Sequence, residues 1–390
     1  MILSREHEEA RASFAEWADR EVAPHAGRWD REAITPTEAV RALAATGWLG
    51  GTVAREHGGA GMDWVTFALL CEELGRACSS IRSLVTVHAM VCYAVGRWGS
   101  AAQRRRWLPQ LASGAAIGAF GLSEPDAGSD VASIATTARA DGDGYLLQGR
   151  KSWTTYGQIA ELFLVVARVE GQPVALLVER GAPGLVVEPL EGVTGTRASM
   201  LATLRLDGCR VPRENRLAGP GFGVAVALSS LEVGRLSVAA GCVGIVRACL
   251  DASLAYAAGR RQFGVAIAEH QLVQRMIADM ATGWRAARLL TLRAAALRDA
   301  GSPDAGNESF VAKYFASTAA TRAALDAVQL HGANGCTDRY PVERYLRDSR
   351  VMEIIEGSTQ IQQVTIAAHE LRHAGRTPEA GPHTVRENRP

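Results

Sequence analysis

The apolar residues of this chain change their spacing twice, near residue 117 and again near residue 221. In the first third, apolar side chains recur at positions i, i+3, i+4 and i+7, the spacing of helices packed on one another. The middle segments are short and β-branched or alternating, and Gly, Asp and Pro separate them, as in antiparallel strands. Helical spacing then returns in four long segments, at 222–258, 269–300, 308–331 and 358–374.

This order predicts a protein that is mostly α with a central β domain. The expected parts are an N-terminal helical domain at 1–116, a middle antiparallel β domain at 117–220, a C-terminal four-helix bundle at 221–374 and a disordered tail at 375–390. Strands and helices do not alternate, so a parallel Rossmann sheet is not expected. No GxGxxG follows a strand and no GxxxxGK[ST] occurs, so a dinucleotide would have to bind by other means.

Composition gives no support to nucleic acid or an anionic membrane as a partner, because the net charge is +1 and only 21% of residues are charged. The N-terminus does not look like a signal peptide, and no run of 18 apolar residues predicts a transmembrane helix. The seven cysteines form no CxxC pair, which favours buried free thiols in a reducing compartment over a disulfide framework or a metal site. The cytoplasm is therefore the expected location.

Two candidate ligand-binding segments lie at or inside the β domain. FGLSEPDAGSD (120–130) offers backbone groups, a hydroxyl at Ser123 and close backbone approach at Gly128 and Ser129, although an ordinary capped turn would use the same residues. KSWTTYG (151–157) places Trp153 before two threonines at the start of a strand, where it could stack on a flat ring. A half-buried strand residue is the other use of such a tryptophan.

Two more segments lie in the C-terminal third. GRRQFG (259–264) suits a pyrophosphate and an adenine, or else a charged helix end. In MEIIEGSTQIQ (352–362), Glu356 is flanked by isoleucines and a glycine, so its carboxylate should be desolvated and its pKa raised toward that of a useful base. A carboxylate at a helix N-terminus is the alternative. Ser358 and Thr359 open the next helix, whose free N–H groups could hold a phosphate or ribityl oxygen.

Together, EPDAGSD, RRQFG and IIEGSTQIQ, in this order and at this spacing, resemble the acyl-CoA dehydrogenase family from about residue 5 to residue 374. The resemblance implies an N-terminal helical domain, a middle antiparallel β-barrel and a C-terminal four-helix bundle. It also implies an FAD cofactor lying partly across a subunit interface of a homotetramer or homodimer. The implied reaction is dehydrogenation of an acyl thioester, with Glu356 taking the α-proton while the β-hydrogen leaves as hydride to the flavin. Some relatives place the base just before the arginine that Arg235 matches; here that place is Gly234.

The resemblance also implies roles for other residues, taken position by position. The residues implied to bind FAD are Phe120, Leu122, Ser123, Trp153, Thr155, Arg260, Gln262, Phe263, Gln329, Gly332, Ala333, Ser358 and Gln360. Among them, Arg260, Gln262 and Phe263 match a segment that reaches the FAD of the neighbouring subunit. The residues implied to lie at the substrate are Ser129, Arg235 and Gly357.

Departures from the family pattern concern the substrate. Cys336 replaces a common aromatic residue, and GVTGTRAS (192–199) departs from the usual loop. GRLSVAAGCVGIVRAC (234–249) and MEIIEGS (352–358) are similar to dehydrogenases that act on acyl carrier protein thioesters in polyketide synthesis, such as hydroxy- or methoxymalonyl units. A short acyl-CoA is the rival substrate. The electron acceptor would be an electron-transferring flavoprotein, or oxygen in a flavin oxidase on the same scaffold; a non-enzymatic helical interaction protein is the third possibility.

Overall fold

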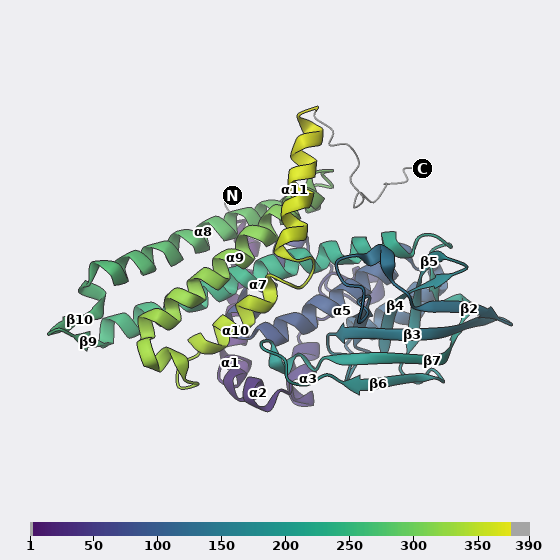
Figure 1. Cartoon of the computed structure of the whole chain (residues 1–390), viewed down its shortest axis with the longest axis horizontal. Coiled ribbons are helices and arrows are strands. Elements are labelled where there is room, and N and C mark those ends of the chain that lie inside the picture. Colours follow the sequence, from purple (N-terminus) through teal and green to yellow (C-terminus); the bar gives the residue numbers. More distant parts are fainter. Residues whose placement is uncertain (1–2, 376–390) are drawn as a thin grey trace.

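The computed structural model describes residues 3–375. Helices form both ends of this part of the chain and strands form the middle (Figure 1). The expected boundaries at 116/117 and 220/221 fall in the loops between the last helix and first strand, and between the last strand of the sheet and the next helix. Apart from Gly375, the tail expected to be disordered lies outside the described residues.

The N-terminal part is a group of helices. The helices are α1 (Arg5–Glu21), α2 (Ala26–Glu32), α3 (Thr37–Ala45), α4 (Trp64–Ala77), α5 (Ser79–Trp98) and α6 (Ala101–Ala112). Among them, α1, α4 and α6 begin at a capping side chain. Ser4, Asp63 and Ser100 each accept a hydrogen bond from a backbone N–H in the first turn of the helix that follows. α4 and α5 are buried on nearly all sides because the C-terminal helices cover them.

The middle part is one sheet with the strand order β6-β7-β3-β2-β4-β5-β8, and β1 also pairs with β4. Its strands are β1 (Gly118–Gly121), β2 (Thr137–Asp141), β3 (Gly144–Thr154), β4 (Leu162–Val169), β5 (Gln172–Glu179), β6 (Leu185–Pro189), β7 (Ala202–Pro212) and β8 (Arg216–Leu217). Most pairs are antiparallel, as expected. The β1–β4 pair and the single β2–β4 bridge are parallel.

The C-terminal part is built on α7 (Gly223–Gly259), α8 (Gln271–Asp299) and α9 (Ala305–His331), which pack on one another. The short hairpin of β9 (Arg261–Gln262) and β10 (Val265–Ala266) joins α7 to α8. α10 (Val342–Met352) and α11 (Thr359–His373) both pack on α9, and α11 then projects away from the other helices (Figure 1).

α7 is the central helix of the molecule and packs against α4, α5, α8 and α9. By length and composition alone it could cross a membrane, but 72% of its most apolar window is buried inside the protein, as in the core helix of a soluble protein. It approaches α4 closely: a Cβ on Gly75 would lie 2.5 Å from the Gly241 Cα. Only glycine permits this crossing, which also aligns α7 with α5 beside the site described next.

Candidate functional site

Glu356 lies in the tight connection between α10 and α11. Its backbone is in the left-handed region, with φ 55°, and Gly357 follows with φ 93°. Ser358 then caps α11 by accepting a hydrogen bond from the Ile361 N–H. The Gln362 side chain donates to the backbone oxygens of Glu356 and Gly357 at 3.1 and 2.8 Å. These contacts hold a strained loop in one conformation and direct the Glu356 side chain into the protein.

The Glu356 carboxylate packs against α7 at Gly234. A Cβ placed on Gly234 would lie 2.3 Å from Glu356 Oε2 and 3.1 Å from the Met90 Sδ of α5. Glycine at position 234 is therefore what leaves room for the carboxylate. Oε2 is buried and has no hydrogen-bond partner among the described residues. An unpaired buried carboxylate oxygen is costly and marks a group that awaits a ligand or a proton.

Burial raises the pKa of Glu356 from 4.5 to about 7, and the positive charges of Arg235, Arg82 and Lys313 oppose that rise. Arg235 is buried, with its guanidinium 4.0 Å from the centre of the Phe310 ring. Lys313 is fully buried and donates to the Gly357 carbonyl at 2.7 Å. The raised pKa agrees with the expected desolvation, but the flanking isoleucines do not cause it, because Ile354 is 57% exposed; the carboxylate is covered by α7 and α5. A pKa of about 7 suits a general base near neutral pH.

Sequence reasoning missed Arg82, Met90 and Lys313, although all three belong to this site. Each sits in a stretch that reads as ordinary helix, and no local signal separates it from a surface or core residue. His88 and His331 have the contacts of packing residues. His88 is fully buried between the Gly118 N–H and the Leu111 carbonyl, and His331 stacks on Tyr256.

The two β-domain segments meet one another beside the C-terminal end of β3. Phe120 lies in β1 and Leu122 and Ser123 follow it; the Ser123 carbonyl accepts a hydrogen bond from the Ser152 N–H. A buried ion pair, Lys151–Glu124 at 2.6 Å, fixes the two segments together. Glu124 also accepts from two backbone N–H groups, which hold the EPDAGSD loop in place. Ser129 is exposed farther along this loop.

Trp153 stands at the end of β3, not at the start of a strand as the sequence suggested. Its φ is 60° and 59% of the residue is exposed, whereas Thr155 after it is partly buried. The half-buried alternative considered for Trp153 therefore does not describe it. A large aromatic ring held in an unusual backbone conformation and left in the open is suited to covering a ligand.

The GRRQFG segment lies far from the β domain within one chain (Figure 1). Arg260, Gln262 and Phe263 are on or beside the β9–β10 hairpin, and Phe263 is 94% exposed with φ 53°. Leu330, at the end of α9, packs on Ala257 near the hairpin. The exposed residues Gln329, Gly332 and Ala333 are therefore at the same end of the molecule, while Ser358 and Gln360 stay beside Glu356. A single chain does not bring these groups together.

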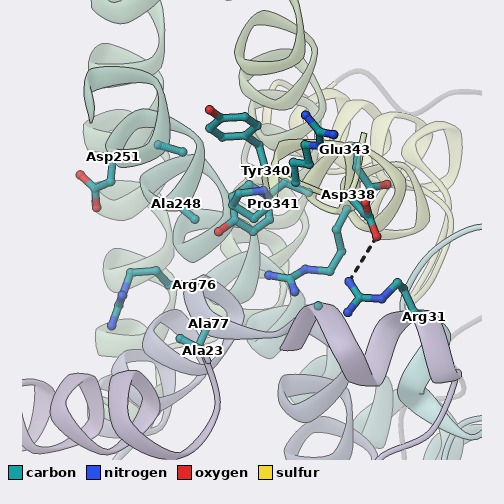
Figure 2. A pocket seen from close by; sticks show the side chains of 15 residues that line it. Ala23, Arg31, Arg76, Ala77, Ala248, Asp251, Asp338, Tyr340, Pro341 and Glu343 are labelled. Carbon is teal, nitrogen blue, oxygen red and sulfur yellow. Dashed lines mark ion pairs between the residues drawn. The ribbon is translucent and has the colours of Figure 1, made fainter. Parts of the chain in front are cut away.

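A pocket of about 350 Å³ lies between α2, α4, α7 and the start of α10. Figure 2 shows the side chains that line it. Its lining mixes charges of both signs, including the Arg31–Asp338 ion pair at 3.4 Å, and none of the candidate site residues borders it. It is separate from the Glu356 site.

Family models match almost the whole described chain. The acyl-CoA dehydrogenase N-terminal domain matches residues 4–115, the middle domain 119–209 and the C-terminal domain 221–371. The chain belongs to the acyl-CoA dehydrogenase family. Members are FAD-dependent oxidoreductases that act on the CH–CH group of an acyl-CoA. As an acyl-CoA dehydrogenase, the protein keeps the family's three-part fold, and Glu356 stands in the family's C-terminal domain.

This acyl-CoA dehydrogenase is similar to the mitochondrial short-chain specific acyl-CoA dehydrogenase of Mus musculus, with 38% identity over 95% of this chain and 91% of the relative. A solved glutaryl-coenzyme A dehydrogenase–glutaryl-CoA complex matches with TM-score 0.93 and 36% identity over 98% of this chain and all of the other. FkbI, for biosynthesis of the methoxymalonyl extender unit of the polyketide Fk520, matches with TM-score 0.84 and 36% identity over 93% and 99% of the two chains.

Two further solved neighbours are informative about chemistry. The prolyl acyl carrier protein oxidase AnaB matches with TM-score 0.90 and 29% identity over 95% of this chain and all of the other. A Mycobacterium smegmatis glutaryl-CoA dehydrogenase in complex with FADH2 matches with TM-score 0.90 and 29% identity over 97% of each chain.

Proposed function

We propose that this acyl-CoA dehydrogenase removes the α- and β-hydrogens of a short acyl thioester and that Glu356 is the base that takes the α-proton. The observation that carries the proposal is the Glu356 carboxylate itself. It is buried, one of its oxygens has no partner among the described residues, and its pKa of about 7 makes it both ionisable and basic near neutral pH. Gly234 provides the space, and Gln362 and Lys313 fix the backbone that aims it.

FAD is the cofactor that we propose, and the exposed aromatic residues fit it. Trp153 and Phe263 are large, open to solvent and held at positive φ, as expected of rings that a flat cofactor covers. The buried Thr154 hydroxyl has no partner among the described residues, so a polar ligand at the end of β3 would satisfy it. When bound, FAD supplies the acceptor for the β-hydride. Phe120, Leu122, Ser123, Trp153, Thr155, Ser358 and Gln360 would hold it in one subunit.

The separation of the GRRQFG hairpin from the β domain supports a site shared between subunits. Arg260, Gln262 and Phe263, with Gln329, Gly332 and Ala333, would reach the adenosine and pyrophosphate of a neighbour's FAD in a homodimer or homotetramer. Exposed arginines suit the pyrophosphate, and the exposed phenylalanine suits the adenine ring.

The chain's own groups would perform the remaining work. The Glu356 N–H would donate to the thioester oxygen, where negative charge develops as the α-proton leaves. Arg235, buried beside the carboxylate, would stabilise its ionised form, and Gly357 would line the same end of the thioester. Ser129, on the exposed EPDAGSD loop, would contact the pantetheine arm.

A thioester of an acyl carrier protein is the second candidate substrate. FkbI and AnaB, whose descriptions concern an extender unit and an acyl carrier protein, favour it; the mouse short-chain enzyme favours acyl-CoA. The acceptor would be an electron-transferring flavoprotein, since a structure solved in work on the electron transferring flavoprotein of Acidaminococcus fermentans matches this chain. Oxygen is the other candidate acceptor, because the similar AnaB is an oxidase.

Anaerobic bleaching of the flavin's visible absorbance tests the proposal directly. Matched short acyl-CoA and acyl-carrier-protein thioesters should bleach the wild-type flavin, and Glu356→Gln should slow bleaching by at least about 100-fold because the base is lost. Glu370→Gln, on the exposed face of α11, is the matched control and should behave as wild type. If only the acyl-CoA thioesters or only the acyl-carrier-protein thioesters bleach the flavin, that result identifies the group that carries the acyl chain. Equal rates in Glu356→Gln and wild type would refute the role of Glu356.

A further inference from the structure

Arg82 is the largest of the fully buried side chains, and its charge has no partner of opposite sign in contact with it. The residue is 1% exposed. Its Nη1 donates to Thr86 Oγ1 at 2.9 Å and its Nη2 to the Met352 sulfur at 3.1 Å, while Nε has no partner. Within residues 3–375, no carboxylate forms an ion pair with it. A buried guanidinium without a carboxylate is unfavourable unless something else supplies the anion.

Arg82 belongs to a row of contacts between α5 and α7 that begins at Glu356. At the first position, Met90 and Gly234 flank the Glu356 carboxylate. At the second, the hydroxyls of Thr86 and Ser237 are 2.6 Å apart.

At the third position of the row, Arg82 Nε lies 2.9 Å from where a Cβ on Gly241 would be, so this glycine makes room for the guanidinium. Arg82 and Met90 are separated by two turns of α5, which corresponds to about 12 Å along the helix.

The guanidinium is turned toward the Glu356 end of this row. Its hydrogen bond to Thr86, one turn closer to Met90, fixes that direction. Its charge is also felt by Glu356, whose ionised form it favours. The row thus runs from the base through two hydroxyls to a cation. A plain alkyl tail needs apolar neighbours, whereas this buried row between α5 and α7 offers hydroxyl groups and a positive charge.

We propose that Arg82 forms the far end of the acyl-binding site and binds a carboxylate on the acyl tail, so that the substrate is a short dicarboxylic acyl thioester. This inference rests on the proposed dehydrogenation at Glu356 and adds the chemical class of the tail. A carboxylate paired with Arg82 can form two parallel charge-assisted hydrogen bonds, one of them with the unpartnered Nε. Thr86 and Ser237 would accept or donate along the chain between the two ends.

The test compares thioesters that differ only in tail charge. Succinyl-CoA is paired with butyryl-CoA, and glutaryl-CoA with pentanoyl-CoA, each on the FAD-loaded enzyme under anaerobic conditions. Dissociation constants come from the flavin spectral change and rates from bleaching. The wild type should prefer the anionic member of at least one pair tenfold or more. Arg82→Gln should abolish that preference, weakening the anionic ligand about 100-fold, because truncating one partner of a buried charge pair is strongly unfavourable.

Controls separate charge recognition from folding. Arg97→Gln removes an exposed arginine from the same helix and should keep the wild-type preference. Arg82→Lys keeps the positive charge but loses the paired N–H donors of the guanidinium, so it should retain part of the preference for the anionic thioester. Circular dichroism and flavin content report folding; if Arg82→Gln does not fold, the wild-type preference decides.

Two outcomes are distinguishable. Neutral thioesters that bleach the flavin as well as their anionic partners, in the wild type, would overturn the role of Arg82 and leave the proposed dehydrogenation standing. If neither member of either pair, nor the matching carrier-bound thioesters, bleaches the flavin, the proposed function itself fails and the Arg82 inference fails with it.

Discussion

At the scale of single residues, the site depends on the absence of a side chain at Gly234. Because a Cβ there would lie 2.3 Å from Glu356 Oε2, Gly234→Ala should push the carboxylate out of place. Misplacing a reacting group by about 1 Å can cost about 100-fold in rate, and we expect a loss of that order in flavin reduction. The measurement is single-turnover bleaching. Gly96→Ala, a helical glycine with open space around it, is the control and should retain wild-type rates.

The raised pKa of Glu356 predicts two pH dependences. The bleaching rate should rise with pH through about 7, as the carboxylate loses its proton. The contribution of Glu356 to the free energy of unfolding should fall as pH rises. The folded protein holds this proton more tightly than the unfolded chain, whose carboxyl has a pKa near 4.5, so stability from this group is present below 4.5 and is lost as pH rises to about 7.

Glu356→Gln has no carboxyl group at this position, so it should not lose stability as pH rises from 4.5 to about 7. Its melting temperature should match the wild type at low pH and exceed it above pH 7, by the equivalent of about 1 to 3 kcal/mol. Thermal unfolding followed by circular dichroism across this range is the measurement, with Glu370→Gln as a variant that should show no such divergence. A constant difference at all pH values would contradict the assigned pKa.

Glu356 was predictable from sequence because it is a lone carboxylate between apolar residues and a glycine in a segment that resembles the family pattern. The source of its burial was not predictable, because α7 and α5 cover the carboxylate while the neighbouring Ile354 is 57% exposed. Arg82 and Lys313 were not predictable either. Each is a long charged side chain in a helix, and such residues are normally at the surface. Arg82 is buried where α5 packs on α7, and Lys313 is buried where α9 packs on α7 and α11. These are relations between segments far apart in the chain that no local pattern carries.

At the scale of elements, an aspartate from one helix caps the start of another. The Asp299 carboxylate, at the end of α8, accepts from the N–H groups of Trp64 and Val65 in the first turn of α4 at 2.7 and 3.1 Å. Asp299→Ala should lower the free energy of unfolding by about 1 kcal/mol, as the loss of a helix cap does. Denaturant titration measures it. The control is Asp143→Ala, which changes an exposed turn residue and should leave the denaturant midpoint of unfolding nearly unchanged. If both variants lost the same free energy of unfolding, Asp299 would not act as a cap.

The long helices were predicted to within a few residues, because their apolar spacing persists over many turns: 222–258 became Gly223–Gly259, and 269–300 became Gln271–Asp299. β7 was not predicted. Asp207 and Gly208 interrupt its pattern, yet the strand continues through them. Gly208 has φ 59° and sits where the register against β3 shifts, so it forms a bulge that the sheet absorbs.

At the scale of the whole molecule, the β9–β10 hairpin presents an aromatic ring at the end remote from the sheet (Figure 1). Phe263→Ala should lower FAD retention after gel filtration without changing the helical content, if the hairpin serves a neighbouring subunit's cofactor. Light scattering should show a homodimer or homotetramer. Ile34→Ala, at another exposed apolar position, should retain FAD fully. A monomer that holds FAD equally well in both variants would refute the shared site.

Six of the seven cysteines are buried and only Cys336 is exposed. Burial raises the pKa of Cys71 and Cys242 to about 12 and of Cys209 to about 11, so these thiols are inert at neutral pH while the fold is intact. They come from α4, α7 and the sheet, so no local opening exposes them together. In the native protein, a chromogenic disulfide reagent should therefore react with one thiol per chain, that of Cys336. Once the protein unfolds, the reagent should react rapidly with all seven thiols. The number of reactive thiols would then measure global unfolding without an added label.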